Sequence, residues 1–314
     1  MKRTHALGRT VAQTAVAVAA AAVALTGCGS GAGTGRPAAP AGSTAARDLT
    51  YAEDLRVSDA EQRLVQRCMA RHGFRYWEER TLTLEESRPL GYVQDDVGWA
   101  RAHGYGSRIA AKEDRARLHN PNSAYRAALP APRRSGYDTA LDGGRSAELL
   151  RTRAPGGGTV AKQYGGCTGE AERRLYGDPA TWFRLDTTAG NLRPLYVGRL
   201  LKDRRFTAAV HAWSRCMARV GHPFPDPAAA RRAALGPGAR PTRAGEATAY
   251  AAETNIAVAD AGCARRVSLA AVGRAREAHY VGRLPARYTA TLDAYRRLRQ
   301  QALRRAERIV PARA

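Results

Sequence analysis

The sequence predicts a mainly α-helical domain that is stapled by disulfides and built from two related halves, with an irregular insert in the first half. Three observations predict this class. Apolar residues recur at helical spacing, and no convincing run of strands is present. Four cysteines follow a fifth one near the N-terminus. A segment that begins with Cys-Met-Ala-Arg occurs once in each half.

The first 28 residues have the layout of an export signal. Basic residues precede an apolar run over 11–25, which ends in Leu25-Thr26-Gly27-Cys28. A helix that spans a bilayer needs about 20 apolar residues, so this run is too short. An ordinary secretory signal fits the basic and apolar regions but does not explain a cysteine directly after Leu-Thr-Gly.

The tetrapeptide resembles the lipobox of bacterial lipoproteins. This resemblance implies that residues 1–27 are a signal peptide and that Cys28 carries a diacylglycerol. The mature protein would then stay on the extracytoplasmic face of the cell membrane. Residues 28–48 are rich in Gly, Ala, Pro and Ser, and we interpret them as a flexible tether of roughly 20–25 Å.

The charge is strongly positive. The chain has 51 Lys and Arg residues against 28 Asp and Glu residues, a formal net charge of +23. An exported protein of this charge meets anionic partners. Besides the membrane contact through the Cys28 lipid, we expect it to bind lipid headgroups or an anionic envelope polymer. Nucleic acid is not expected, because no zinc-finger, helix-turn-helix or RNP motif is present. A solvated Arg-rich surface without a specific partner is the alternative.

The cysteines other than Cys28 are expected to be paired. Cys68, Cys167, Cys216 and Cys263 are even in number and would lie in an oxidising compartment, where thiols form disulfides. Four cysteines allow three connectivities, and their number alone does not choose among them.

A first helix is expected from Ser58 onward. Ser58 and Glu61 fit a capping box, and apolar residues then recur at helical spacing up to Cys68 and Met69. Gly73 follows at the position that needs a left-handed backbone. Cys68 should therefore lie in the last turn, on the buried face.

The same pattern returns in the second half. A helical stripe that ends at Gly221 places Cys216 beside it, and five of six residues in 68–73 match 216–221. The stripe consists of Phe206, Val210, Trp213, Met217 and Val220.

A second element also matches. Ala161–Cys167 aligns with Ala257–Cys263, each ending in Gly-Cys, and both are expected to be helical, with Val160 and Tyr164 on the face of the first. This order suggests the pairs Cys68–Cys167 and Cys216–Cys263. Each bridge would stabilise the fold by about 4 to 5 kcal/mol on the chain-entropy model.

The domain boundaries follow from this duplication. Residues 49–195 would form the first helical half and residues 196–314 the second. The insert at 78–155 carries short helices near 108–119 and 122–129. A basic helix is expected from 286 to about 310, with its apolar face on the domain and its arginines outward. The alternative is that it lies on the anionic membrane surface.

Several stretches look like secreted lipoproteins of actinobacteria. They are the lipobox, the Cys-Met-x-x-x-Gly-Phe segment at 68–74, and the stretches 120–125, 137–143 and 259–263. The resemblance covers most of the mature chain through short motifs. It implies location and topology, and no chemistry.

No motif for catalysis, a metal or a cofactor is present. The sequence lacks Cys-x-x-Cys, His-Glu-x-x-His, Gly-x-Ser-x-Gly and a phosphate loop. We therefore predict a non-catalytic, envelope-associated binding protein. The alternative is a hydrolase or thiol enzyme with a site in the 78–155 insert, using Cys167 as nucleophile or the carboxylate pairs Glu78-Glu79 and Glu85-Glu86.

Overall fold

The structure is a computed structural model that describes residues 46–236 and 243–311. The predicted signal peptide, Cys28 and nearly all of the predicted tether lie outside these residues. Across the part of the chain that is described, no helix combines the length and the apolar character that crossing a bilayer requires.

Helices dominate, and one two-stranded hairpin accompanies them. In chain order the elements are α1 (Tyr51–Arg71), α2 (Val97–His103), α3 (Ser107–Leu118), α4 (Pro121–Ala128), α5 (Ala131–Asp142), η1 (Gly144–Ser146), β1 (Glu148–Arg153), β2 (Thr159–Tyr164), α6 (Gly166–Tyr176), α7 (Pro179–Gly190), η2 (Arg193–Leu195), α8 (Val197–Leu200), α9 (Arg204–Arg219), α10 (Pro227–Leu235), α11 (Arg243–Arg266), α12 (Leu269–Val281) and α13 (Ala286–Ala306). The two short helices expected in the insert correspond to α3 and α4.

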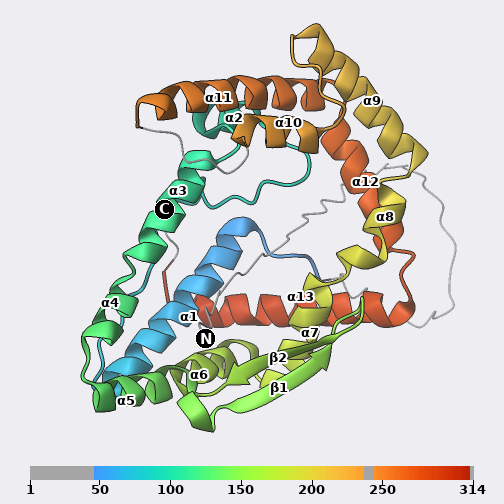
Figure 1. Cartoon of the computed structure of the whole chain (residues 1–314). Coiled ribbons are helices and arrows are strands. Elements are labelled where there is room, and N and C mark those ends of the chain that lie inside the picture. Colours follow the sequence, from blue (N-terminus) through green and yellow to red (C-terminus); the bar gives the residue numbers. More distant parts are fainter. Residues whose placement is uncertain (1–45, 237–242, 312–314) are drawn as a thin grey trace, which may run out of the picture.

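The helices pack around two main apolar cores. The first core joins α1, α5, α6, α7 and α13 around Cys68 and Cys167. The second core joins α8, α9, α11 and α12 around Cys216 and Cys263. Figure 1 shows the helices of the first core in the lower part of the molecule and α9 and α11 of the second core in the upper part. Between the two parts, α3 and α4 run on the left, and α8 and α12 of the second core run on the right.

The expected boundary at 195/196 does not coincide with this packing. From the second half, α13 returns to the first core, where Leu303 and Ala306 are buried. From the insert of the first half, α2 packs against α11, with Ala100 and Ala257 in one small buried cluster. The second core also buries Leu192, so each core contains residues from both halves of the sequence.

The first helix begins earlier than expected. The side chain of Thr50 accepts from the Glu53 amide, and Glu53 accepts from the Thr50 amide at 2.7 Å, so the capping box is Thr50–Glu53. Ser58, the expected N-cap, lies inside α1. The upstream box is favoured because Arg47 pairs with Glu53 at 2.6 Å, and because the added turns bury Val57.

The expectation of helix at Val160 and Tyr164 is wrong. Both lie in β2, which pairs antiparallel with β1 across a turn at 154–158. The helix cannot extend back over this segment, because α6 begins at Gly166, whose φ is +55°. A Cβ at Gly166 would stand 2.6 Å from the carbonyl oxygen of Ala140, so only glycine fits there.

The two Cys-Met-Ala-Arg helices end in the same way. The amide of Phe74 donates to the carbonyl of Met69 at 3.0 Å, and the amide of His222 donates to that of Met217 at 2.9 Å. Both ends are Schellman motifs with a left-handed glycine, Gly73 or Gly221, as expected. The partner cysteines differ, however: Cys167 starts α6 after a strand, whereas Cys263 lies near the end of the long helix α11.

A buried polar network crosses the second core. Asp260 of α11 is fully buried and accepts from the Tyr105 hydroxyl at 2.8 Å and from the Trp213 indole at 2.9 Å. Burial raises the pKa of Asp260 to about 6, although these hydrogen bonds and the charge of Arg231 oppose the shift. Glu253, two turns earlier on the same face of α11, accepts from the amides of Tyr105 and Ser107. The network thus fixes the insert onto α11.

Candidate functional site

The four cysteines form two disulfides, and these join the pairs that the sequence order suggested. Cys68 bonds Cys167 with a Cα–Cα distance of 5.5 Å, and Cys216 bonds Cys263 with a Cα–Cα distance of 5.7 Å. All four side chains are at most 2% exposed. Both disulfides therefore lie inside the cores, as expected of bonds that stabilise the fold.

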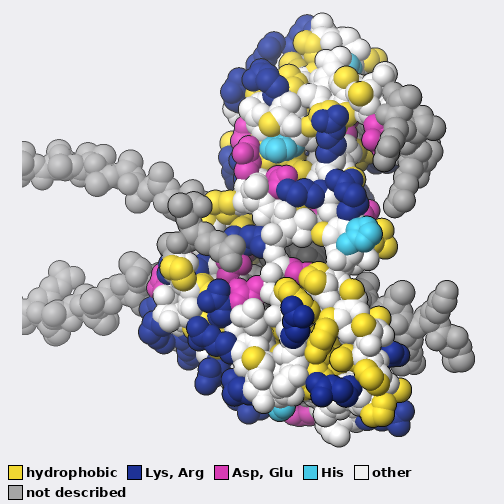
Figure 2. Space-filling model, turned by 90° about the vertical axis from the view of Figure 1, so that its left-hand side faces the viewer, with side chains coloured by type: hydrophobic (Ala, Val, Ile, Leu, Met, Phe, Trp, Pro, Cys, Tyr) yellow, Lys and Arg dark blue, Asp and Glu magenta, His cyan; other side chains and the backbone are white. Residues whose placement is uncertain are grey.

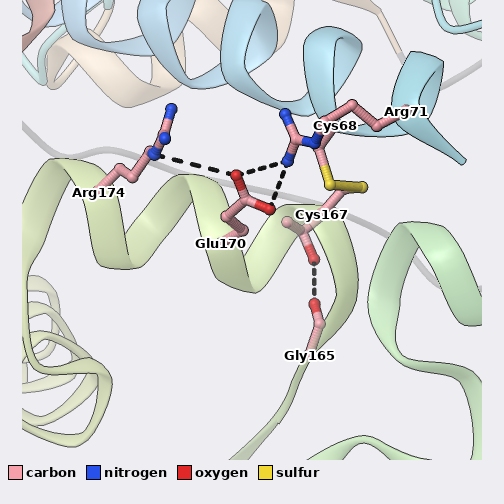
Figure 3. The surroundings of a disulfide bond; sticks show 7 residues. Cys68, Arg71, Gly165, Cys167, Glu170 and Arg174 are labelled. Carbon is pink, nitrogen blue, oxygen red and sulfur yellow. Dashed lines mark hydrogen bonds and ion pairs between the residues drawn. A yellow bond between two sulfur atoms is a disulfide. The ribbon is translucent and has the colours of Figure 1, made fainter.

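An ion pair accompanies the first disulfide across the same helix contact. Glu170 of α6 accepts from Arg71 of α1 at 2.7 Å and lies 3.9 Å from Arg174 (Figure 3). The three side chains are 39–59% exposed, so solvent screens their charges and the disulfide dominates the contact between α1 and α6.

A small pocket of about 350 Å³ adjoins this disulfide. His72 is one of its lining residues, and atoms of His72, Cys68 and Cys167 lie within 4.8 Å of one another. Nucleophilic attack and metal binding both need a thiolate, and here each sulfur is bonded to the other. The other lining residues are Phe74, Ser135, Gly136, Thr139, Ala140 and Gly166.

The first carboxylate pair of the insert is engaged in contacts within the fold. Glu78 forms an ion pair with Arg63 of α1, and Glu79 accepts from Asn120, the N-cap of α4. Burial raises the pKa of Glu79. These contacts hold the start of the insert against α1.

The second pair is engaged in the same way. Glu86 binds Lys112 at 2.7 Å, and this contact, with the cap at Thr83, lowers the pKa of Glu86. Glu85 lies 3.5 Å from His103. The two pairs therefore connect α1, α2, α3 and α4 rather than face one another across a cleft.

The C-terminal basic helix packs on the domain. In α13, Leu303 is buried, and Tyr295 and Leu298 pack against the first core. Three of its arginines also turn inward: Arg296 pairs with Asp48 at 2.9 Å, Arg299 pairs with Asp54, and Arg305 donates to the carbonyl of Leu175 at 2.7 Å. Its exposed arginines are Arg287, Arg297 and Arg304.

A cluster of cations lines an open pocket of about 570 Å³ at the start of α9. Its residues come from the segment 202–205 and from α12. They are Lys202, Asp203, Arg204, Arg205, Arg276, His279 and Tyr280. We call this site the basic pocket.

The one carboxylate of the basic pocket is fully engaged. Asp203 caps α9 by accepting from the amides of Arg205 and Phe206, and it also accepts from Arg276 at 2.8 Å and from Tyr280 at 3.0 Å. Its burial would raise the pKa, but these donors lower the pKa of Asp203 to about 2. Asp203 and Arg276 thus cancel in charge.

The remaining cations of the pocket are unpaired. Among the ion pairs of the described residues, none includes the side chain of Lys202, Arg204 or Arg205. All three are exposed. The pocket therefore presents three uncompensated positive charges to solvent.

The charge of the pocket acts on His279. Burial lowers the pKa of this imidazole, and the charges of Arg276 and Arg283 lower it further. At neutral pH the ring is therefore neutral and offers one N–H donor and one acceptor.

Arg204 and Arg205 occupy the first two positions of α9, where the helix dipole disfavours cations. Each costs about 0.3–1 kcal/mol at such a position.

The sequence alone did not single out the segment 202–205, because a run of Lys-Asp-Arg-Arg resembles many solvated stretches. The signal it contains is the placement of two arginines directly after an N-cap aspartate.

No protein-family model, curated protein or solved structure matches this chain significantly.

Proposed function

We propose that this protein is a lipoprotein, anchored to the extracytoplasmic face of the cell membrane through Cys28, that binds anionic partners without catalysis. The anchor is inferred from the sequence Leu25-Thr26-Gly27-Cys28. Binding is inferred from the basic pocket, because Lys202, Arg204 and Arg205 are exposed and unpaired. Partners of this chemistry outside a bacterial membrane are phospholipid headgroups and anionic envelope polymers.

The distribution of charge supports this proposal. Figure 2 shows lysine and arginine side chains over both the upper and the lower part of the face that it draws. Such a field attracts polyanions from solution before any specific contact forms, and the basic pocket then provides a defined place of contact.

The alternative of a cell-envelope hydrolase or thiol enzyme has less support. The Cys167 sulfur is bonded to Cys68, and Glu78, Glu79 and Glu86 are engaged in contacts between helices. None of these groups is in the state that the corresponding chemistry needs.

We also propose that the two Cys-Met-Ala-Arg helices mark two related halves. The matching Schellman ends at Gly73 and Gly221 support this relation, and the pairing of each cysteine with a Gly-Cys segment further along the chain is consistent with it. The strand before Cys167 counts against it.

Titration of the lipidated protein with a soluble polyanion tests the proposed function. The protein would be held in nanodiscs of phosphatidylcholine, which carry no net charge, and polyphosphate would be added at low and at high salt. We expect saturable binding at low salt that weakens steeply as salt rises, because exposed charges are screened beyond about 8 Å at physiological ionic strength. No binding at low salt would contradict the proposal.

A further inference from the structure

We infer that the basic pocket binds the phosphoryl group of a phosphate ester. This inference rests on the proposed function and narrows it to one site and one ligand chemistry. It concerns the segment 202–205 together with Arg276 and His279 of α12.

The charge of the pocket suits a phosphate better than a carboxylate. A phosphate monoester carries about −1.5 to −2 charges at neutral pH, whereas a carboxylate carries one. Lys202, Arg204 and Arg205 are unpaired, and Asp203 cannot repel the ligand strongly because its charge is cancelled by Arg276 at 2.8 Å. Three positive charges therefore face whatever enters.

The donors are arranged to reach several oxygens of one group. Lys202, Arg204 and Arg205 approach from the start of α9, whereas Arg276 and His279 approach from α12. A tetrahedral phosphoryl group presents oxygens in both directions, and guanidinium groups bind them through paired N–H donors.

The lining limits recognition to the polar part of a ligand. Among the described residues that line the pocket, the rings are those of Tyr280 and His279, and none has an aliphatic hydrocarbon side chain. The Tyr280 hydroxyl donates to Asp203, and Arg199 and Arg276 lie 5.7 and 5.5 Å from the centre of its ring. We therefore expect binding of the ester headgroup and none of an attached acyl chain.

The pocket also bears a cost that a bound anion would relieve. Arg204 and Arg205 stand at the positive end of the dipole of α9, and the N-cap position is already taken by Asp203. Cations at this end of a helix destabilise it, whereas an anion between them and the helix is favourable.

Calorimetric titration with glycerol 3-phosphate tests the inference on the lipidated protein in phosphatidylcholine nanodiscs. R204Q/R205Q removes two pocket cations. Its matched control, R297Q/R304Q, removes two exposed arginines from α13 and changes the net charge equally. We expect the pocket variant to bind roughly a hundredfold more weakly, about tenfold per lost charge-assisted contact, and the control to bind like the unmodified protein.

The outcomes separate this inference from the proposed function. If both variants bind glycerol 3-phosphate equally weakly while polyphosphate still binds, the assignment of the ligand to the basic pocket is overturned. Anions would then bind diffusely over the positively charged surface. Failure of glycerol 3-phosphate to bind would also overturn it. Failure of both ligands to bind would overturn the proposed function as well.

A spectroscopic measurement provides an independent readout. A phosphate held beside His279 favours its protonated form, so glycerol 3-phosphate should raise the pKa of His279 in ring ¹³C spectra. An unchanged pKa of His279 at saturating ligand would contradict the assignment.

The same titration in nanodiscs of phosphatidylglycerol identifies the source of the phosphate. If headgroups of the surrounding membrane fill the pocket, they compete and the apparent affinity for glycerol 3-phosphate falls. An affinity equal to that in phosphatidylcholine would assign the pocket to a phosphate ester outside the bilayer.

Discussion

Each of the two cores contains a Cys-Met-Ala-Arg helix end and a disulfide, but the polarity of their buried side chains differs. The first core encloses Cys68–Cys167 within apolar and aromatic side chains. In the second, Asp260 is fully buried one turn before Cys263 and binds Tyr105 and Trp213. A buried polar network costs desolvation, but it pairs only in one arrangement. We infer that the first core supplies mainly stability and the second also fixes where the insert docks.

Removing the disulfides one at a time should give the largest effects. C68A/C167A opens a loop of 99 residues and C216A/C263A one of 47. On the chain-entropy model the losses are about 4.7 and about 4.1 kcal/mol. Urea unfolding of the two variants would measure them. A larger loss of stability on removing the disulfide of the shorter loop would contradict the chain-entropy model. Strain or residual structure in the unfolded chain would then explain the difference between the two disulfides.

Replacing Asp260 with Asn should remove a pH dependence that is specific to the second core. Because the pKa of Asp260 is about 6 in the folded state and 3.8 ordinarily, the folded protein binds this proton more tightly than the unfolded chain. The unmodified protein should therefore gain up to about 3 kcal/mol, relative to D260N, as the pH falls from above 6 to below 4.

The difference between the two proteins isolates Asp260 from other groups. Tyr105, Trp213 and Arg231 act on it in both proteins. Denaturant unfolding at several pH values would measure the gain. A constant difference in stability between pH 4 and 7 would contradict the raised pKa.

The variant R204Q/R205Q should be slightly more stable than the unmodified protein when no ligand is present. Removing two cations from the start of α9 relieves about 0.5–2 kcal/mol of unfavourable interaction with the helix dipole. Thermal unfolding at low salt would measure this gain. Destabilisation would mean that these arginines hold the fold rather than a ligand.

Exchange of the one residue that distinguishes the two helix ends should have the smallest effect. H72V makes residues 68–73 identical to 216–221, and both His72 and Val220 are exposed. We expect a change below about 0.5 kcal/mol, as for most surface substitutions. A larger loss in chemical denaturation would show that the two ends are not equivalent.

The sequence predicted the elements that depend on local pattern. The stripe through Trp213 predicted α9, and Gly73 and Gly221 predicted the helix ends, since only a left-handed residue completes a Schellman motif. The order of the cysteines also suggested both disulfides.

Features that depend on distant contacts were not predicted. Thr50 and Ser58 both begin a sequence that fits a capping box, and only the contacts of Arg47 and Val57 distinguish them. The strand at 159–164 forms because β1 pairs with it. The basic pocket brings the segment 202–205 to α12, a juxtaposition that depends on the packing of the second core.

The central claim is that one cysteine anchors the protein to the membrane, four cysteines form the disulfides of its cores, and the cations of the basic pocket bind anionic ligands. Peptide mapping of the membrane-extracted protein by mass spectrometry, without reduction and after alkylation of free thiols, tests the division of the cysteines most directly. We predict an N-terminal Cys28 peptide with the mass of a diacylglyceryl group, together with linked peptides for Cys68–Cys167 and Cys216–Cys263. An alkylated Cys167, or an unmodified Cys28, would contradict the account.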